Sequence, residues 1–347
     1  MALTSGCAPV SPGGAPEGPA AVYHVYVAAE SADRLHRVSF SPGAGAEVTS
    51  TIPVGRFPTE TEGPHGIAIS PDGEHLYLTT GHGLPDGKLW KYETGADTLV
   101  AREIGLGYFP ATISVTPDGL FAFVANFNLH GERVPSSISV VYTPDMTEVA
   151  RTETCVMPHG SRIDPSGTRH YSVCMMDDRL VEIDTRTFAV ARTLTLPGSA
   201  RGRCSPTWAE PSVDGSKVYV ACNGADRIHE VDRVLWEVTR TIPTGPAPYN
   251  LEATRDGRLL IATLKGGAAV QFFEVGTAQP VGRTPSTGTV THGVVASPDS
   301  RYAFVTVEGV GAEPGKVDVY ELDRFRRVAA VAVGQQAGGI GFWKVER

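Results

Sequence analysis

Short runs in which apolar and polar residues alternate recur along most of the chain, and turn-forming Gly, Asp and Pro residues separate them. Residues 76–80, 88–92 and 99–104 form one such series, with the sequences Leu-Tyr-Leu-Thr-Thr, Lys-Leu-Trp-Lys-Tyr and Leu-Val-Ala-Arg-Glu-Ile. Runs of about four to eight residues with a period of two are typical of β-strands, and short turns join such strands antiparallel. No stretch has the period and length of a long helix. The pattern therefore predicts an all-β protein.

One stretch, residues 63–73 with the sequence Gly-Pro-His-Gly-Ile-Ala-Ile-Ser-Pro-Asp-Gly, returns in imperfect copies. Aligned on the Pro-Asp-Gly-like turn, the copies are residues 109–119, 157–167, 205–215, 247–257 and 290–300. The equivalent turn residues are separated by 46, 48, 48, 42 and 43 residues; they are Asp72, Asp118, Ser166, Asp214, Asp256 and Asp299. A repeat of this length indicates the blades of a propeller or the units of a solenoid.

The six copies begin six blades, numbered 2 to 7, and the two ends of the chain remain for blade 1. Residues 338–345 resemble the innermost strands, while residues 22–29, 34–40 and 48–54 would supply the other three strands. Joining the ends in one blade closes the ring and covers two strand edges that would otherwise be exposed. We therefore predict one seven-bladed β-propeller of four-stranded antiparallel blades over residues 22–347.

The second strands of the blades share a recurring sequence of an aromatic residue, an aliphatic residue and two smaller ones. Examples are Tyr-Leu-Thr-Thr at residues 77–80, Phe-Val-Ala-Asn at 123–126, Tyr-Val-Ala-Cys at 219–222 and Phe-Val-Thr-Val at 304–307. With the Ser-Pro-Asp-Gly turns that precede them, these runs resemble the Tyr-Val-Thr-Asn (YVTN) family of seven-bladed β-propellers. The resemblance implies the fold but no single activity, because such propellers include lactonases, lyases, metalloenzymes and interaction platforms.

Charge and composition narrow the classes of partner. The 347 residues carry a formal net charge of -8, which disfavours binding to nucleic acid. No run approaches the length of about 18 apolar residues that a membrane-spanning helix needs. Residues 1–21 are rich in Pro, Gly, Ala and Ser, which predicts a disordered tail. Cys7 in this tail is either the lipidated residue of a bacterial lipoprotein, which would make the protein extracytoplasmic, or an ordinary cysteine that leaves a cytoplasmic location open.

The blade geometry places one residue of each innermost strand at a mouth of the central channel. In blades 1 to 7 these residues are Gly338, His65, Ala111, His159, Thr207, Tyr249 and His292. The three histidines of blades 2, 4 and 7 are about 100°, 150° and 100° apart around the axis. Side chains that converge in this way predict a metal site with nitrogen–metal distances of about 2.0–2.1 Å. The alternative is that Pro-His-Gly is a structural entry to the strand, with each His capping backbone groups.

A second ring follows from the ends of the second strands, which lie at the same mouth because they run antiparallel to the first. Its members are Glu30, Gly81, Phe127, Met175, Asn223, Lys265 and Glu308. The carboxylates of Glu30 and Glu308 flank His65 and His292, and could act as ligands, as partners that orient the imidazoles, or as general bases. With Tyr249 of the first ring, they are the catalytic candidates. His82 and Asn128, one position further on, are weaker candidates, and exposed loop residues are the alternative for each.

Four of the five cysteines gather in blades 4 and 5: Cys155, Cys174, Cys204 and Cys222. They form one or two disulfides that join adjacent loops, or act as metal ligands, or are buried thiols. Soft sulfur ligands beside imidazoles would favour copper over magnesium or calcium. No Cys-x-x-Cys spacing supports the ligand alternative.

Three functions fit these observations. The first is a metalloenzyme in which three histidines bind a transition metal, copper first and zinc or iron as alternatives, and act on a small molecule over the axis by Lewis-acid or redox chemistry. The second is a metal-free lyase or lactonase that uses His as acid and base. The third is a binding platform without catalysis. For the first, metal affinity should fall as the pH drops through about 6.5, because protons compete for imidazole.

Overall fold

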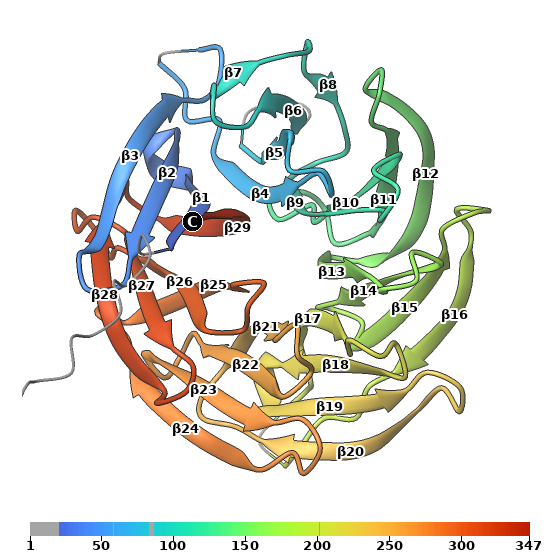
Figure 1. Ribbon diagram of the computed structural model, residues 1–347. Helices are drawn as coiled ribbons and strands as arrows, with labels where there is room; N and C mark the ends of the chain where they lie inside the picture. Colours follow the sequence, from blue (N-terminus) through green and yellow to red (C-terminus); the bar gives the residue numbers. More distant parts are fainter. Residues whose placement is uncertain (1–20, 58, 83–86, 201) are drawn as a thin grey trace, which may run out of the picture.

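Seven four-stranded antiparallel sheets stand around a central axis in the computed structural model, and together they form a seven-bladed β-propeller (Figure 1). The structure describes residues 21–57, 59–82, 87–200 and 202–347. The predicted disordered tail, with Cys7, therefore lies outside the described residues except for Ala21. Within the described ranges the helical elements are two short 3-10 turns, η1 (Glu30–Ala32) and η2 (Asn223–Ala225). The predicted fold class and blade number are confirmed.

Each blade is built in the same order from the axis outward. The innermost strands of blades 1 to 7 are β29 (Ala337–Glu346), β4 (Pro64–Ile69), β9 (Pro110–Val115), β13 (Pro158–Ile163), β17 (Pro206–Pro211), β21 (Pro248–Ala253) and β25 (Val290–Ala296). The second strands are β1 (Val22–Ala29), β5 (His75–Thr80), β10 (Phe121–Asn126), β14 (Arg169–Cys174), β18 (Lys217–Cys222), β22 (Leu259–Leu264) and β26 (Tyr302–Glu308).

The third and fourth strands complete the blades toward the outside of the ring. The third strands are β2 (Arg34–Ser41), β6 (Lys88–Glu93), β11 (Pro135–Tyr142), β15 (Arg179–Asp184), β19 (Arg227–Asp232), β23 (Ala269–Glu274) and β27 (Lys316–Glu321). The outermost strands are β3 (Gly45–Pro53), β7 (Thr98–Leu99) with β8 (Ile104–Gly105), β12 (Thr147–Val156), β16 (Val190–Thr195), β20 (Glu237–Pro243), β24 (Pro280–Pro285) and β28 (Arg326–Ala332).

Blade 2 departs from the prediction in its outermost strand. Residues 99–104 were expected to form one strand, but β7 and β8 pair separately with β6 and leave the segment between them outside the ladder. In that segment the Glu103 carboxylate turns to an ion pair with Arg56, at a distance of 2.6 Å. Leu99 pairs with Tyr92 and Ile104 with Leu89, so the outer segment has two residues more than β6 between these pairs and leaves the ladder there.

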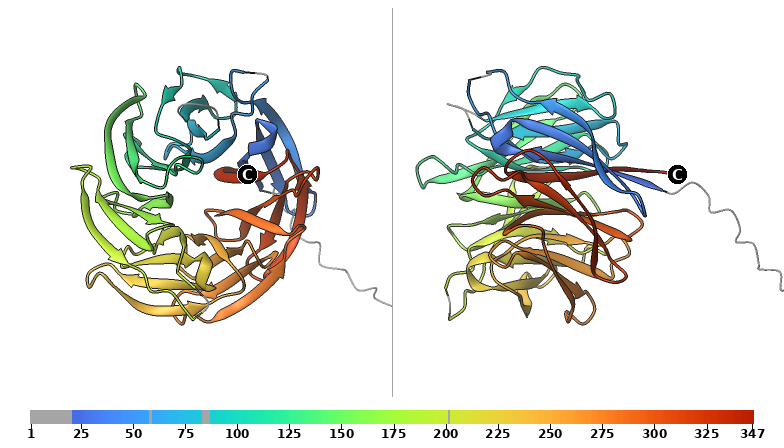
Figure 2. Two further views of the ribbon diagram at one scale, coloured as in Figure 1. Left: turned by 180° about the vertical axis from the view of Figure 1, so that it is seen from behind. Right: turned by 90° about the vertical axis from the view of Figure 1, so that its left-hand side faces the viewer.

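The ring closes through a blade that contains both ends of the chain, as predicted. Strand β29 pairs antiparallel with β1, and Val22 lies opposite Glu346. The start of β1 and the end of β29 therefore lie on one face of the ring, while Ala337 and Ala29, at the other ends of these strands, lie on the opposite face (Figure 2).

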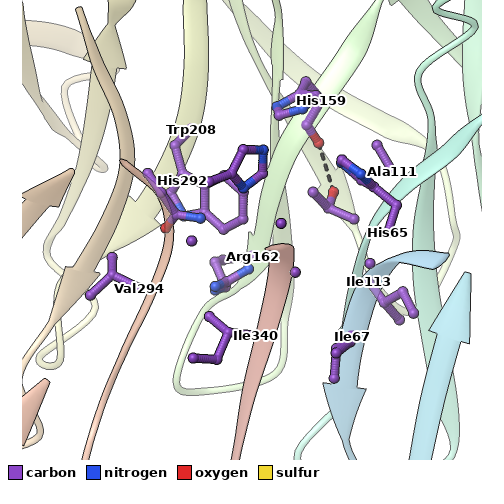
Figure 3. A pocket seen from close by; sticks show the side chains of 16 residues that line it. His65, Ile67, Ala111, Ile113, His159, Arg162, Trp208, His292, Val294 and Ile340 are labelled. Carbon is purple, nitrogen blue, oxygen red and sulfur yellow. Dashed lines mark hydrogen bonds between the residues drawn. The ribbon is translucent and has the colours of Figure 1, made fainter. Parts of the chain in front are cut away.

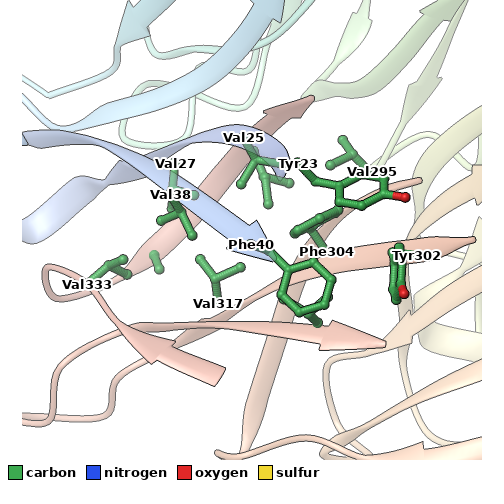
Figure 4. Close-up of a cluster of buried hydrophobic side chains, with 13 residues drawn as sticks. Tyr23, Val25, Val27, Val38, Phe40, Val295, Tyr302, Phe304, Val317 and Val333 are labelled. Atoms are coloured by element: carbon green, nitrogen blue, oxygen red, sulfur yellow. The ribbon is translucent and has the colours of Figure 1, made fainter. Parts of the chain in front are cut away.

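The described residues form eight hydrophobic clusters, and seven of them lie one between each pair of neighbouring blades. The eighth consists of Phe109, Ala111 and Phe127 of blade 3. Blades 7 and 1 meet through four aromatic rings that contact one another edge to face or at a tilt, those of Tyr23, Phe40, Tyr302 and Phe304 (Figure 4). The second strands contribute to the cluster on each side of their blade, which explains why they are buried at nearly every position. This packing fixes the angle at which each innermost strand meets the axis.

Candidate functional site at the axial mouth

A sharp bend precedes the innermost strands and directs their first residues to one mouth of the channel. In blades 2 to 6 the innermost strand begins with a proline, and the residue before that proline has a left-handed conformation. The φ angles are 63° at Gly63, 48° at Phe109, 59° at Met157, 43° at Ser205 and 51° at Ala247. The left-handed region is costly for residues other than Gly, so packing across the blades must hold these bends. The residue after the proline, which is His65 or His159 in two of the blades, then opens the strand at the axis.

The glycine that follows each histidine lets neighbouring blades approach closely. A Cβ atom at Gly66, Gly160 or Gly293 would lie less than 3.0 Å from the backbone carbonyl oxygen of the ring residue in the next blade. The threonine of the Tyr-Val-Thr-Asn-like run adds a second constraint in blades 6 and 7, where Thr263 donates to the carbonyl of His292 and Thr306 to that of Gly338. Backbone contacts of this kind set the positions of the imidazoles.

The mouth is a cavity of about 510 Å³ that both predicted rings line. From the predicted sets it contains His65, His159, Tyr249, His292, Gly338, Glu30, Phe127, Met175, Asn223, Lys265 and Glu308. The predicted ring members Gly81, Ala111 and Thr207 do not line it. All six residues predicted as metal ligands or catalytic groups are therefore brought together, and blades 3 and 4 add an apolar wall to the mouth.

His65 is held by a carboxylate that also holds a second imidazole. Glu30 accepts a hydrogen bond from His65 Nδ1 at 2.7 Å on one oxygen and lies 2.7 Å from His82 Nε2 on the other. Burial raises the pKa of Glu30, but the two imidazoles outweigh burial and lower it to about 2. The hydrogen bond to Glu30 raises the pKa of His82. Glu30 is thus an anion that orients His65 and leaves its Nε2 free of this contact.

His159 is held by a backbone carbonyl and a phenol. Its Nδ1–H donates to the carbonyl of Thr207 at 2.8 Å, so its Nε2 is an acceptor. The hydroxyl of Tyr249 lies 3.2 Å from that Nε2 and is its donor. Burial raises the pKa of Tyr249, which keeps the phenol protonated. In this arrangement Tyr249 occupies the nitrogen that a metal ion would use.

His292 lies beside an ion pair. Its Nε2 is 3.7 Å from the carboxylate of Glu308, and that carboxylate pairs with Lys265 at 2.9 Å. The Lys265 ammonium also lies 4.3 Å above the ring of Tyr249. Burial tends to lower the pKa of Lys265, but its electrostatic interactions with Tyr249 and Glu308 outweigh burial and raise the pKa. Charged, aromatic and imidazole groups are therefore in contact along one wall of the mouth.

Burial keeps two of the imidazoles neutral. It lowers the pKa of His159 to about 3, and together with the nearby Lys265 charge it lowers the pKa of His292 well below the usual value. Desolvation disfavours the charged form of a base. The window near pH 6.5 that was expected for competition between protons and metal therefore moves to lower pH for these two residues.

The three imidazoles do not form a closed metal site in this conformation. The rings of His65 and His292 are 5.7 Å apart between centroids, and the rings of both contact aromatic neighbours. In the described part of the chain, three or more His, Cys, Asp or Glu residues bring possible metal-binding atoms within 4.8 Å of one another in two places only. These places are Cys204 with Cys222 and His229, and Asp72 with Glu74 and His75, so the three imidazoles of the mouth are not among them.

The cysteines form two disulfides, Cys155–Cys174 and Cys204–Cys222. The disulfide alternative is confirmed, and the alternatives of thiolate ligands and buried free thiols are wrong for these four residues. The Cys204–Cys222 bridge joins the segment before β17 to the end of β18 within blade 5. Cys155, which was expected in blade 4, lies in β12, the outermost strand of blade 3, because that strand continues almost to the start of β13. The Cys155–Cys174 bridge therefore joins blade 3 to blade 4. A sulfur atom committed to a disulfide is not a thiolate, so the soft atoms left near the mouth are those of methionine.

Beyond the imidazoles, the channel continues as a narrow space of about 30 Å³. Figure 3 shows His65, His159 and His292 at one end of this space, with Arg162 and aliphatic side chains such as Ile340 beyond them. Lys265 and His82 were not among the predicted metal ligands or catalytic groups, although the strand register had already placed them at or next to the second ring. Their partners, Glu308 and Glu30, explain their positions.

Comparisons with known proteins agree with the fold. The chain is similar to a hydrazine synthase structure from Kuenenia stuttgartiensis, with a TM-score of 0.67 and 20% identity over 83% of this chain and 93% of that one. It is also similar to a protein from Desulfotomaculum acetoxidans, with a TM-score of 0.74 and 16% identity over 92% and 98% of the two chains. At these identities the likeness concerns the fold alone.

No protein-family model and no curated protein sequence matches the chain. The seven-bladed arrangement is confirmed, while membership of the Tyr-Val-Thr-Asn family stays a prediction. In the described ranges no helix is long and apolar enough to cross a membrane.

Proposed function

We propose that the axial mouth binds one transition-metal ion through His65, His159 and His292, and that the ion acts on a small molecule held in the cavity. The convergence of three buried imidazoles on one mouth carries this proposal. Two of them have Nδ1 held by Glu30 or by the carbonyl of Thr207, the kind of support that orients metal-binding histidines. The neutral imidazole is also the form that binds metal.

Metal binding requires a small rearrangement of the ring. Ligand nitrogens at about 2.0–2.1 Å from one ion lie closer together than those of the present imidazoles. The imidazoles must therefore turn toward the axis, and Tyr249 must release His159 Nε2. Gly338 leaves room for this movement, because a Cβ atom there would lie 3.7 Å from His292 and 3.9 Å from His65.

Copper remains the first candidate for the ion, with zinc or iron as alternatives. Imidazole donors suit all three metals, and copper(II) binds most tightly in the general order of divalent ions. Met175 lines the mouth and offers a soft thioether, whereas the cysteines are disulfides. Disulfides are typical of oxidising compartments, which favours an extracytoplasmic location.

A bound ion would supply Lewis-acid or redox chemistry, and the neighbouring side chains would supply proton transfer. Tyr249 is a protonated phenol that can donate a proton, and Glu308 is a carboxylate that can accept one. Lys265 lies beside both and provides a positive charge for an anionic group of the substrate. The cavity of about 510 Å³ has room for a small organic molecule.

A metal-free lyase or lactonase is the second candidate. The hydrogen bond between Tyr249 and His159 favours it, because an acid and a base in contact can pass a proton without a metal. Activity that survives complete removal of metal, and that is lost in Tyr249→Phe and His159→Ala, would support this candidate over the first. A binding platform would show neither bound metal nor catalysis.

The test of the metal proposal uses a variant that changes no ligand. Gly338→Val places methyl groups between His65 and His292, whereas Gly338→Ala makes only ordinary contacts. We expect Gly338→Ala to retain bound metal and Gly338→Val to lose it, as measured by elemental analysis of folded protein. His75→Ala is the control for adventitious binding at the Asp72, Glu74 and His75 group. Loss of metal in that control but not in Gly338→Val would place the ion at the surface turn and contradict the proposal.

A further inference from the structure

A second ring of residues lies at the other end of the channel, at the fifth position of the innermost strands. In β9 this residue is Ser114, and in the next three blades it is Arg162, Glu210 and Glu252. Arg162 lines both the narrow space under the imidazoles and a wider cavity beyond it. Two glutamates and an arginine on consecutive blades therefore face a mouth that is distinct from the histidine mouth.

Part of the role of these glutamates is structural. Glu210 Oε1 accepts the backbone N–H of Ala253 at 3.3 Å, and Glu252 Oε1 accepts that of Ala296 at 3.2 Å. Each of these bonds joins one blade to the next. Ser114 makes the same connection, because its hydroxyl oxygen accepts the backbone N–H of Ile163 at 2.9 Å. A hydroxyl is thus sufficient for this bond, and the negative charges of the glutamates are not required by it.

The remaining oxygens of the two carboxyls have few hydrogen-bond donors or cations close to them. Glu210 Oε2 is buried and has no hydrogen-bond partner among the described residues, and its nearest cation is Arg162 at 3.6 Å. Glu252 has no ion pair with any described residue. Burial is the main cause that raises the pKa of both carboxyls, and the neighbouring Glu252 charge adds to it for Glu210. The positive charges of Arg162 and Arg255 offset this rise only in part. A positive charge bound between them would stabilise both in their ionised form.

The cavity beside these carboxyls has the size and walls of a site for a small organic molecule. Its volume is about 760 Å³, within the usual range for ligand pockets. Aliphatic and aromatic side chains, among them Ile69, Val295 and Trp343, line it together with the glutamates. It opens on the face where β1 begins and β29 ends.

We propose that this second mouth binds a small organic ammonium ion, with its charged nitrogen between Glu210 and Glu252 and its apolar part against the cavity wall. A divalent metal ion suits the site less well. Such an ion needs about six or more oxygen ligands. Arg162, Arg255 and Lys344 line the same cavity, and their positive charges repel a doubly charged ion more strongly than a singly charged ammonium. An ammonium needs only a few acceptors and gains from the apolar wall.

The test titrates the full-length protein with n-butylammonium at pH 7.5 by calorimetry, with butyrate and Ca²⁺ as comparison probes. We expect saturable binding of n-butylammonium alone, with release of a proton as the carboxyl pair ionises. Proton release is measured from the dependence of the heat on the ionisation enthalpy of the buffer. Glu252→Gln and Glu210→Gln should each weaken binding at least tenfold. Glutamine retains the acceptor for the bond to the next blade, so both variants are expected to fold.

Two controls make the result specific. Glu313→Gln changes an exposed glutamate in a turn and should leave binding unchanged. His65→Ala should also leave it unchanged, because the imidazoles lie at the other end of the channel. Failure of the metal proposal therefore does not affect this one. Binding of Ca²⁺ or butyrate in place of n-butylammonium, no binding of any probe, or undiminished binding by the two glutamine variants would overturn the proposal.

Discussion

Replacement of His170 by Leu should make the free energy of unfolding less sensitive to acid. The replacement removes one group that binds a proton in the unfolded chain but not in the folded protein. His170 is fully buried, stacks on Phe123 at 5.0 Å, and has no hydrogen-bond partner on either ring nitrogen among the described residues. Burial lowers its pKa to about 3. The unfolded chain binds this proton near pH 6.5 and the folded chain does not. Stability associated with the neutral imidazole is therefore lost as the pH falls from about 6.5 toward 3.

The size of the effect follows from the pKa difference. Between pH 6.5 and 5.0 the wild-type protein should lose about 2 kcal/mol of stability through His170, at about 1.36 kcal/mol per pH unit. The His170→Leu variant should not lose this contribution, because it has no imidazole at that position. Carboxylates with lowered pKa, such as Glu30, lose their contribution only below about pH 4.5, outside this window.

The assay is urea unfolding of both proteins at pH 7.0 and pH 5.0, followed by fluorescence and circular dichroism. The difference in unfolding free energy between variant and wild type should shift by about 2 kcal/mol in favour of the variant on acidification. Parallel changes in the two proteins would refute the reasoning. They would also undermine the neutral state of His159, which rests on the same burial effect.

Three further predictions follow from the site and the ring. Tyr249→Phe should tighten metal binding about two- to tenfold in a competition titration, because the tyrosine hydroxyl no longer competes with the metal for His159 Nε2. Weaker metal binding by this variant would instead indicate that Tyr249 is a ligand. Deletion of residues 338–347 should abolish cooperative thermal unfolding, since it removes most of β29 and opens the ring; a truncated protein that melts like the full chain would refute the closure. Under non-reducing conditions, intact mass should be lower by four hydrogens because of the two disulfides, and alkylation of Cys155 or Cys174 in the folded protein would contradict them.

Much of the architecture was predictable because each blade repeats the same order of turn residues and alternating apolar and polar positions. Turn residues such as Asp72 recur every 42 to 48 residues, and the alternation between them defines the strands. Once one innermost strand is placed, the repeat places the equivalent residue of every other blade, which is how His65, His159 and His292 were found. The interruption of the outermost strand in blade 2 was not predictable, because it depends on the register against β6, which leaves two extra residues in the outer segment and is not visible in the alternation of residues 99–104.

Pairings between side chains were harder to predict than positions. The register placed Glu30 and Glu308 at the mouth, but not the bridge from Glu30 to both His65 and His82. The pairing of the cysteines likewise depends on distances within blade 5 and between blades 3 and 4. The same register, continued three residues along each strand, would have found Glu210 and Glu252 at the second mouth.

The most direct test of the central claim is the metal content of the protein in which His65, His159 and His292 are all replaced by Ala. The protein should be expressed and purified beside the wild type, loaded with copper, zinc or iron, and passed through a desalting column before elemental analysis. Circular dichroism and thermal unfolding establish that the propeller is intact. The account predicts about one ion per wild-type chain, copper held most tightly, and none in the triple variant. Stoichiometric metal in the folded triple variant would contradict it.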